Sequence, residues 1–394
     1  MSASLLKETL DQKTFAEFFA GIGLMRVGLE DAGWSIAFAN DIDKDKRDMY
    51  RTHFPDADDH FVLDDIHTLI PDDIPTVALA TASFPCNDLS LAGMRTGLGG
   101  KQSSAFWGFM RILEELEERR PPIVMVENVA GFLTSHQGRD FQAALLALNR
   151  LGYSVDALIV DAERFVPQSR VRLFVIGSLQ EGHGAWEVHD TPGFYQSAVR
   201  PQALADFIFG HPEIAWKVRK LPDPPKRTAK LPAILERLPD DSSYWWSEER
   251  TGYLVSQMSE KHFGQLNEMK TKRTWSYGTV FRRVRNGKSM AELRTDGVAG
   301  CLRTPRGGSG RQILVQAGYG KVKARLLTPR ECARLMGTDG FRIKASLNKA
   351  LFGFGDAVCV PVITWLADHY LNPLVEEMAL PFARQSRHRK KVSA

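Results

Sequence analysis

Short apolar runs alternate with amphipathic segments through the first 180 residues, and this alternation limits the possible folds more than any other feature. The strand-like runs are residues 14–19, 35–40, 60–66, 76–84, 122–128, 154–162 and 172–178. The helix-like segments are residues 27–33, 44–54, 105–120 and 140–152. A strand–helix–strand rhythm of this kind predicts an α/β fold with a Rossmann-like, doubly wound and mostly parallel sheet whose crossovers are right-handed.

The rhythm ends near residue 180. Residues 181–300 are rich in Pro, Trp and polar residues and show no recognisable helix–strand alternation, so we expect a smaller, irregular domain there. We expect residues 1–180 and about 340–394 to form the large domain, and about 181–339 to form the small one.

Helical patterns return near the end of the chain. The run LTPRECARLMG predicts a helix with Thr328 as N-cap and Pro329 at the first helical position. Residues 362–380 predict a last helical stretch, which we expect to pack back onto the sheet.

The composition is that of an ordinary globular protein, with 43% hydrophobic and 25% charged residues in a chain of 394. We expect no membrane span and no signal peptide, because no apolar run reaches about 20 residues. The cysteines (Cys86, Cys301, Cys332 and Cys359) lack CxxC spacing, so neither a disulfide framework nor a metal site is expected. A cytoplasmic location fits this cysteine usage.

Positive charge is concentrated in one segment although the net charge is only +4. Residues 261–330 carry 16 Lys and Arg against three acids, and residues 384–394 form a second basic cluster. A charge run is usually a solvated face, but Trp275, Tyr277 and Phe281 are interleaved with this one. That mixture favours a polyanionic partner.

The run FFAGIG, residues 18–23, leads from a predicted strand into a helix and allows backbone to approach a ligand at the helix N-terminus. It is not a full GxGxxG motif, because Arg26 takes the place of the third glycine, and this argues against NAD. Asp41 follows at the distance usual for an acid that binds ribose hydroxyls. Asp65, after the third strand, is a candidate for the adenine amino group of an adenosine-containing cofactor.

Cys86 lies just beyond the carboxyl end of the strand predicted at 76–84, where open α/β sheets bind ligands. A lone cysteine is more often a buried small hydrophobe than a nucleophile. Here Pro85 stiffens the preceding turn, and a glycine-rich segment at residues 93–100 could close over a substrate.

Glu127 ends the apolar run 122–128, which places a carboxyl group at the same sheet edge as Cys86. The alternative is that Glu127 caps the next helix. Arg170 and Arg172 are two residues apart, and therefore on one face, at the entry of another strand. Arginines that lead into a buried strand suit an anionic or electron-rich ligand.

A thiolate, an acid and an arginine pair beside an adenosyl cofactor suit methylation of cytosine carbon 5. Addition of the thiolate to carbon 6, with an acid at N3, makes carbon 5 nucleophilic enough to take a methyl group from a sulfonium. An arginine at the exocyclic oxygen would stabilise the developing charge. A base inside a duplex is out of reach, so the target must be flipped out while a second domain holds the DNA.

These residues, in this order, resemble the C5-cytosine-specific DNA methyltransferase family of bacterial restriction–modification systems. The resemblance covers FAGIG, Asp41, Asp65, FPC at 84–86, ENV at 127–129 and QSRVR at 168–172, and continues in LRTPRGGSGRQ, LTPRECARLMG and FGDAV. It spans roughly residues 14–180 and 298–362, and leaves unmatched the middle segment, where this family varies its target-recognition region.

The resemblance implies S-adenosyl-L-methionine as cofactor and double-stranded DNA as substrate. It implies that Cys86 is the nucleophile, that Glu127 and Arg172 hold the base, and that Arg170 supports the site. The cofactor-binding residues that it implies are Phe19, Gly21, Ile22, Gly23, Asp41, Asp65, Pro85 and Asp356. The DNA-binding residues that it implies are Ser90, Arg303, Arg306, Gly307, Gly308 and Arg311.

The chain departs from the family pattern at three places. Asp356 stands where the family usually has Asn, which affects contacts near the methionine end of the cofactor. The run KQSSAFW lacks the Asp and Arg common before the aromatic helix start, and Asn87 replaces the commoner Gln after Cys86.

Other functions remain as alternatives. The first is a transfer-RNA cytosine-5 methyltransferase on the same fold, and the second is a non-catalytic DNA-binding relative. The basic, Trp-bearing middle segment favours a DNA-reading domain over the first, and the retention of Cys86, Glu127 and Arg172 speaks against the second. A cognate restriction endonuclease would act on the same DNA sequence. We expect a monomer, because one flipped base needs one pocket.

Overall fold

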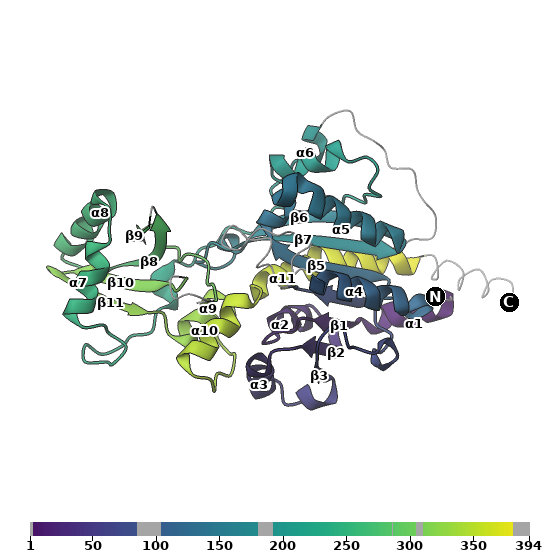
Figure 1. The fold of residues 1–394 in the computed structure, drawn as a ribbon, viewed down its shortest axis with the longest axis horizontal. Coiled ribbons are helices and arrows are strands. Elements are labelled where there is room, and N and C mark those ends of the chain that lie inside the picture. Colours follow the sequence, from purple (N-terminus) through teal and green to yellow (C-terminus); the bar gives the residue numbers. More distant parts are fainter. Residues whose placement is uncertain (1–2, 85–103, 180–191, 286, 305–309, 381–394) are drawn as a thin grey trace, which may run out of the picture.

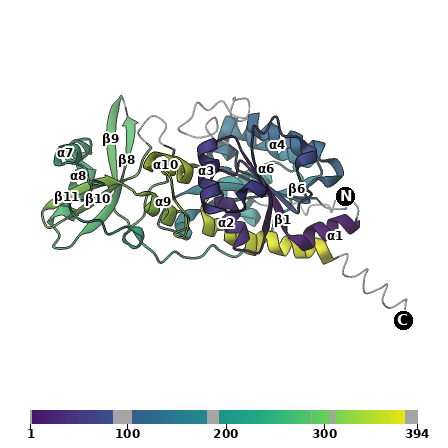
Figure 2. The same cartoon turned by 90° about the horizontal axis from the view of Figure 1, so that it is seen from below.

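The computed structural model describes residues 3–84, 104–179, 192–285, 287–304 and 310–380. It has a large unit built on a seven-stranded sheet and a smaller unit built on a four-stranded sheet, placed side by side along the long axis (Figures 1 and 2). The large unit is a mostly parallel α/β sheet with helices on both faces, as the sequence predicted.

The large sheet has the strand order β3-β2-β1-β4-β5-β7-β6. Its strands are β1 (Thr14–Phe18), β2 (Ser35–Asp41), β3 (Phe61–Leu63), β4 (Leu79–Ala82), β5 (Ile123–Val129), β6 (Tyr153–Asp161) and β7 (Val171–Leu179). The helices of this unit are α1 (Ala3–Gln12), α2 (Leu24–Glu30), α3 (Lys44–His53), α4 (Ser104–Glu115), α5 (Arg139–Arg150), α6 (Gln202–Gly210), α9 (Pro329–Leu335), α10 (Leu347–Asp356) and α11 (Val360–Leu366).

The topology gives the sheet one natural place for a ligand. Strands β1 to β5 are parallel, and the chain turns from one side of β1 to the other when it passes from β3 to β4. Such a switch point leaves a crevice at the carboxyl ends of the strands. β7 is antiparallel to both β5 and β6, and Arg172 pairs with Val129, so the amino end of β7 lies at the same edge.

Alternating side chains of the central strands enter two separate cores. Phe15 and Leu79 point into one core, which they share with α2 and α11, whereas Phe18 and Ala80 point into the other with α4 and α5. Strand residues buried on both faces read as continuous apolar runs, which is why the sequence revealed these strands.

The C-terminal helices complete the first of these cores. The stretch Leu347–Leu380 is long and apolar enough to cross a membrane, but 72% of its apolar window is buried inside the protein. α11 packs so closely on α2 that a Cβ at Gly28 would lie 2.6 Å from the Cβ of Ile363. The predicted return of residues 362–380 to the large unit is therefore confirmed, as is the cap of α9, where Thr328 forms a capping box.

The small unit is more regular than the sequence analysis expected. It has an antiparallel sheet in the order β11-β10-β8-β9. Its elements are α7 (Glu248–Ser256), α8 (Glu260–Thr271), β8 (Ser276–Arg285), β9 (Lys288–Arg294), β10 (Ile313–Gly318) and β11 (Lys321–Leu326). Parts of the range expected to form the small domain also pair with the large unit, since Trp216 bridges to Val155 and Ala299 to Gln168.

A buried ion pair joins three distant segments of the large unit. Asp156 on β6 is fully buried and accepts hydrogen bonds from Arg200 Nη2 at 2.6 and 2.8 Å. It also accepts from the Arg219 backbone N–H at 2.9 Å and from the Tyr370 hydroxyl at 3.1 Å. This one carboxylate therefore ties the segment after β7 and the C-terminal helix to the sheet.

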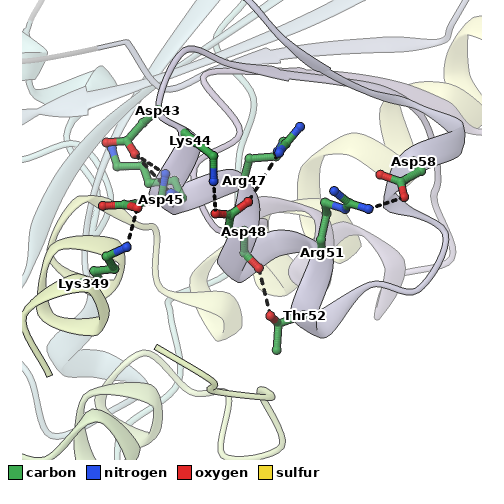
Figure 3. A network of polar contacts seen from close by, with 10 residues as sticks. Asp43, Lys44, Asp45, Arg47, Asp48, Arg51, Thr52, Asp58 and Lys349 are labelled. Carbon is green, nitrogen blue, oxygen red and sulfur yellow. Dashed lines mark hydrogen bonds and ion pairs between the residues drawn. The ribbon is translucent and has the colours of Figure 1, made fainter. Parts of the chain in front are cut away.

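We predict that Asp156→Ala lowers the free energy of unfolding by about 3–5 kcal/mol, because it leaves the buried Arg200 charge without its counter-ion. Lys44→Ala is the control, since its ion pair with Asp48 on α3 is exposed and should contribute less than about 1 kcal/mol (Figure 3). Chemical denaturation of the two variants measures the difference. Equal losses would contradict this account.

Candidate active site

A cavity of about 240 Å³ lies at the carboxyl edge of the large sheet, at the switch point between β1 and β4. The segments that follow β1, β2 and β4 line it, together with the end of β5, the start of β7 and the end of α10. Its charged lining residues are Glu17, Asp41, Asp43, Lys46, Glu127, Arg170, Arg172 and Asp356. Residues from both halves of the sequence therefore meet in one pocket.

The turn after β1 has a backbone that only particular residues tolerate. Gly21 and Gly23 have φ values of 58° and 84°, in the left-handed region that favours glycine. A Cβ at Gly23 would also lie 2.5 Å from the ring of Phe54. The Gly21 N–H donates to Asp41 Oδ2 at 2.8 Å, which holds the turn against the end of β2.

Asp41 is the main polar group at this end of the cavity. Its other oxygen, Oδ1, accepts the Asp43 backbone N–H at 2.8 Å. A carboxylate oxygen can accept more than one hydrogen bond, so Asp41 can still accept from a ligand. Burial raises the pKa of Asp41, and the nearby Lys46 opposes this rise. Ile42, which follows Asp41, lines the same cavity although its side chain is 66% exposed, and the sequence analysis did not identify it.

The structure separates the expected cofactor-binding residues into two groups. Phe19, Gly21, Asp41 and Asp356 line the cavity, whereas Ile22, Gly23 and Asp65 are not among its lining residues. Ile22 is buried in the core, and the carboxylate of Asp65 accepts the backbone N–H of His67 at 3.0 Å. Pro85 lies outside the described residues.

Glu127 and Arg172 form an ion pair at the edge of the sheet, with 3.0 Å between Glu127 Oε1 and Arg172 Nε. Both side chains line the cavity. The neighbouring Asn128 donates to the backbone oxygen of Phe84 at 3.2 Å and so fixes the end of β4 beside this pair. Cys86 lies two residues beyond Phe84, outside the described part of the chain.

Arg170 is buried and faces the backbone of the C-terminal half. Its guanidinium donates to the carbonyl oxygen of Leu302 at 2.9 Å, to that of Gly355 at 3.1 Å and to that of Ala357. Burial, with Arg172 nearby, lowers the pKa of Arg170. These bonds hold the end of α10 and the residue after it against the start of β7. Arg170 therefore supports the wall of the cavity.

Cys301 is a neighbour of the site that was not expected from the sequence. Arg170 Nη1 donates to its Sγ at 3.4 Å. Burial would raise the pKa of the Cys301 thiol, but Arg170, Arg172 and Arg303 together outweigh burial and lower it. The sequence around Cys301 did not indicate this contact, since Arg170 and Arg172 come from a distant part of the chain.

Lys46 and Asp356 form a second ion pair in the cavity wall, with 2.7 Å between Nζ and Oδ2. Lys46 comes from α3 and Asp356 is the last residue of α10. Burial would lower the pKa of Lys46, but Asp356 and Asp41 raise it, so the amine is charged at neutral pH. Asp356 was expected at this site from the sequence, whereas its partner Lys46 was not.

Two of the expected DNA-binding residues can be placed. Arg303 is exposed, and its guanidinium lies 5.3 Å from the ring centroid of Phe281 on β8. Arg311 Nη2 donates to Asn348 at 3.0 Å. The remaining ones lie outside the described residues: Ser90, Arg306, Gly307 and Gly308.

Several cations of the basic segment 261–330 form ion pairs with acids, some inside the segment and some outside it. The pairs are Arg285–Glu292, Arg294–Asp296, Lys323–Asp240, Arg325–Glu331 and Arg330–Asp339. Exposed cations remain near the tip of the β8–β9 hairpin, at Arg283 and Lys288. The hairpin projects from the four-stranded sheet (Figure 2).

Comparisons with known proteins place this arrangement in a family. The sequence profile described as C-5 cytosine-specific DNA methylase matches residues 13–372. The type II methyltransferase M.DsaV of Dactylococcopsis salina is 30% identical over 363 residues, which cover 92% of this chain and 86% of that protein. The type II methyltransferase M.HhaI of Haemophilus parahaemolyticus is 26% identical over 358 residues, 90% of this chain and 92% of that protein.

Solved structures share the fold at lower identity. The Dnmt2 methyltransferase of S. pombe has a TM-score of 0.59 at 20% identity and covers 92% of this chain and 98% of that chain. The methyltransferase EhMeth of Entamoeba histolytica has a TM-score of 0.62 at 15% identity, covering 92% and 99%.

We predict that Arg170→Lys lowers the free energy of unfolding by about 2–4 kcal/mol, because an ammonium cannot reach all three carbonyl oxygens that the guanidinium bonds. Arg172→Lys is the matched control. It keeps a cation beside Glu127 and should cost less than about 1 kcal/mol. Denaturant titration of both variants checks the order, and a larger loss for Arg172→Lys would contradict the supporting position of Arg170.

Proposed function

Because the chain belongs to the C-5 cytosine-specific DNA methylase family, we propose that it methylates a cytosine flipped out of a specific duplex DNA sequence through a covalent Cys86–C6 adduct. It is a DNA (cytosine-5-)-methyltransferase, and S-adenosyl-L-methionine is the methyl donor of this family. The observation that carries the proposal is the Glu127–Arg172 ion pair in the cavity. Phe84, two residues before Cys86 in the sequence, lines the same cavity.

The cavity suits an adenosyl ligand. Asp41 has spare acceptor capacity for ribose hydroxyls, and the exposed Ile42 beside it offers an apolar surface to a base. Glu17 Oε2 is buried with no hydrogen-bond partner in the described part of the chain, and Glu17 lines the same cavity. Polar groups left open in this way fit a ligand that brings its own donors. When bound, the cofactor supplies an electrophilic methyl group on a sulfonium.

The roles of the side chains follow from the electron demand of cytosine. The Cys86 thiolate forms a bond to C6, and the C5–C6 electron pair becomes available at C5 for the methyl group. Glu127 donates a proton or a hydrogen bond to N3, and Arg172 holds Glu127 in place while it stabilises charge on the exocyclic oxygen. A solvent base then takes the C5 proton, and the electrons of that C–H bond re-form the C5–C6 double bond as the C6–Sγ bond breaks. The Cys86 thiolate is released, and any proton given to N3 returns to Glu127.

We assign the small unit to DNA recognition. The β8–β9 hairpin offers exposed cations, and Arg303 lies beside Phe281 at its base. Such groups suit phosphates, while base-edge contacts would determine the sequence that is read. Together with Arg303 we assign to DNA contact Ser90, Arg306, Gly307, Gly308 and Arg311.

The type II names of the relatives favour a place in a restriction–modification system. The enzyme would act as a monomer and protect the sites of a cognate endonuclease, with no direct contact between the two. Bisulfite sequencing of DNA from cells that express the chain would identify the methylated sequence. The same method applied to RNA tests the transfer-RNA alternative.

We predict that Cys86→Ala binds duplex DNA but transfers no methyl group, because it lacks the attacking sulfur. Tritium transfer to unmethylated DNA measures this, and covalent trapping on DNA with 5-fluorocytosine at the target site provides a second readout. Cys332→Ala is the control: burial raises the pKa of the Cys332 thiol, which stays protonated, so transfer and trapping should persist. Transfer by Cys86→Ala, or no trapping of the unchanged enzyme, would end the proposal.

We also predict a steep fall in DNA affinity with salt, because phosphate contacts release counterions. Arg283→Ala and Lys288→Ala should each reduce the slope of log K against log[salt] by about 0.9. Arg51→Ala on α3, whose guanidinium pairs with Asp58, should leave the slope unchanged (Figure 3). Fluorescence anisotropy at several salt concentrations gives the slopes, and a flat dependence would remove the hairpin from the interface.

A further inference from the structure

Three cations line the cavity among the described residues, and they are differently engaged. Arg172 pairs with Glu127, and Arg170 bonds backbone carbonyl oxygens. Lys46 pairs with Asp356, but a lysine ammonium has three donors, and a single carboxylate oxygen is within 2.7 Å of it. Lys46 therefore keeps N–H donors that can bind an anionic group of a ligand.

The position of Lys46 relates it to the cofactor. Its side chain lies beside the glycine turn, since a Cβ at Gly21 would lie 4.0 Å from Lys46 Cδ. It is also close enough to Asp41 for each to shift the pKa of the other. A nucleoside whose ribose binds Asp41 would thus place its 5′ substituent within reach of this ammonium. In S-adenosylmethionine that substituent ends in an anionic α-carboxylate.

A second ion pair joins the same two helices without Lys46. Lys349 on α10 reaches Asp45 on α3 at 2.7 Å, as Figure 3 shows. Both of these side chains are about half exposed, and neither lines the cavity. The outer pair already links α3 to α10, whereas the Lys46–Asp356 pair places its charges inside the pocket.

We propose that Lys46 binds the α-carboxylate of S-adenosylmethionine, and that Asp356 is a positioning residue that directs the Lys46 ammonium into the cavity. The inference rests on the proposed assignment of this cavity to the cofactor. It gives a physical reason for the aspartate where the family usually has asparagine, because a neutral amide would not hold a charged lysine in place. Lys46 and Asp356 thus act together as a specificity element for the amino-acid end of the donor.

The test compares two ligands that differ only by the carboxylate, S-adenosylmethionine and its decarboxylated form, by isothermal titration calorimetry on the full chain. We expect Lys46→Met to weaken binding of S-adenosylmethionine by about 10- to 100-fold, the range of one charged hydrogen bond. Binding of the decarboxylated ligand should not change. Lys46→Arg should restore most of the preference, and Asp356→Asn should reduce it by a smaller factor than Lys46→Met.

Lys349→Met is the matched control, since it removes the outer ion pair between the same two helices. It should leave the affinity for both ligands unchanged. Equal weakening of both ligands by Lys46→Met, or no weakening of either, would overturn the role of Lys46 while leaving the cofactor site in place. Failure of the unchanged protein to bind either ligand would instead overturn the cofactor assignment, and this inference with it.

Discussion

β7 runs antiparallel to β5, so that Arg172 pairs with Val129 and the amino end of β7 lies at the carboxyl edge of the sheet. In an all-parallel sheet that edge would receive only residues that follow strands. The reversed strand adds residues that precede one, and it therefore sets Arg170 and Arg172 opposite Glu127. The same reversal lets Arg170 reach the backbone after α10, so the pocket wall depends on the direction of this one strand.

Charges inside the cavity are largely matched in pairs. Glu127 faces Arg172 and Lys46 faces Asp356, while Asp41 accepts two backbone N–H groups. A buried charge without a partner is costly, so these pairs let a polar pocket persist at the centre of a packed sheet. Each pair also retains hydrogen-bonding capacity that a ligand can use. The same side chains can therefore stabilise the folded protein and bind a ligand.

Much of this arrangement was predictable from the sequence, for physical reasons. Strands buried on both faces leave continuous apolar runs, and residues at their carboxyl ends must gather at one edge, so Glu127 could be placed at the edge that β4 also reaches. An apolar run does not encode strand direction, which is why the reversal of β7 was not foreseen. β8 and β9 were not recognised as strands because exposed polar residues interrupt their apolar pattern, as at Arg283 and Arg285 in β8. Lys46 was not identified because a lysine in the charged segment 44–54 resembles a surface residue. The sequence position of Asp65 also did not indicate that its carboxylate would accept the backbone N–H of His67.

The pocket takes one wall from residues 19–46 and another from residues 353–358, more than 300 positions later in the chain. During synthesis the first wall leaves the ribosome long before the second has been translated, at roughly 5–20 residues per second. The nascent sheet can therefore begin to form, but the pocket stays open on one side until the last helices dock on α2. The pocket is therefore complete only when the final tenth of the polypeptide has been made. A prematurely terminated chain could bind DNA without being able to methylate it.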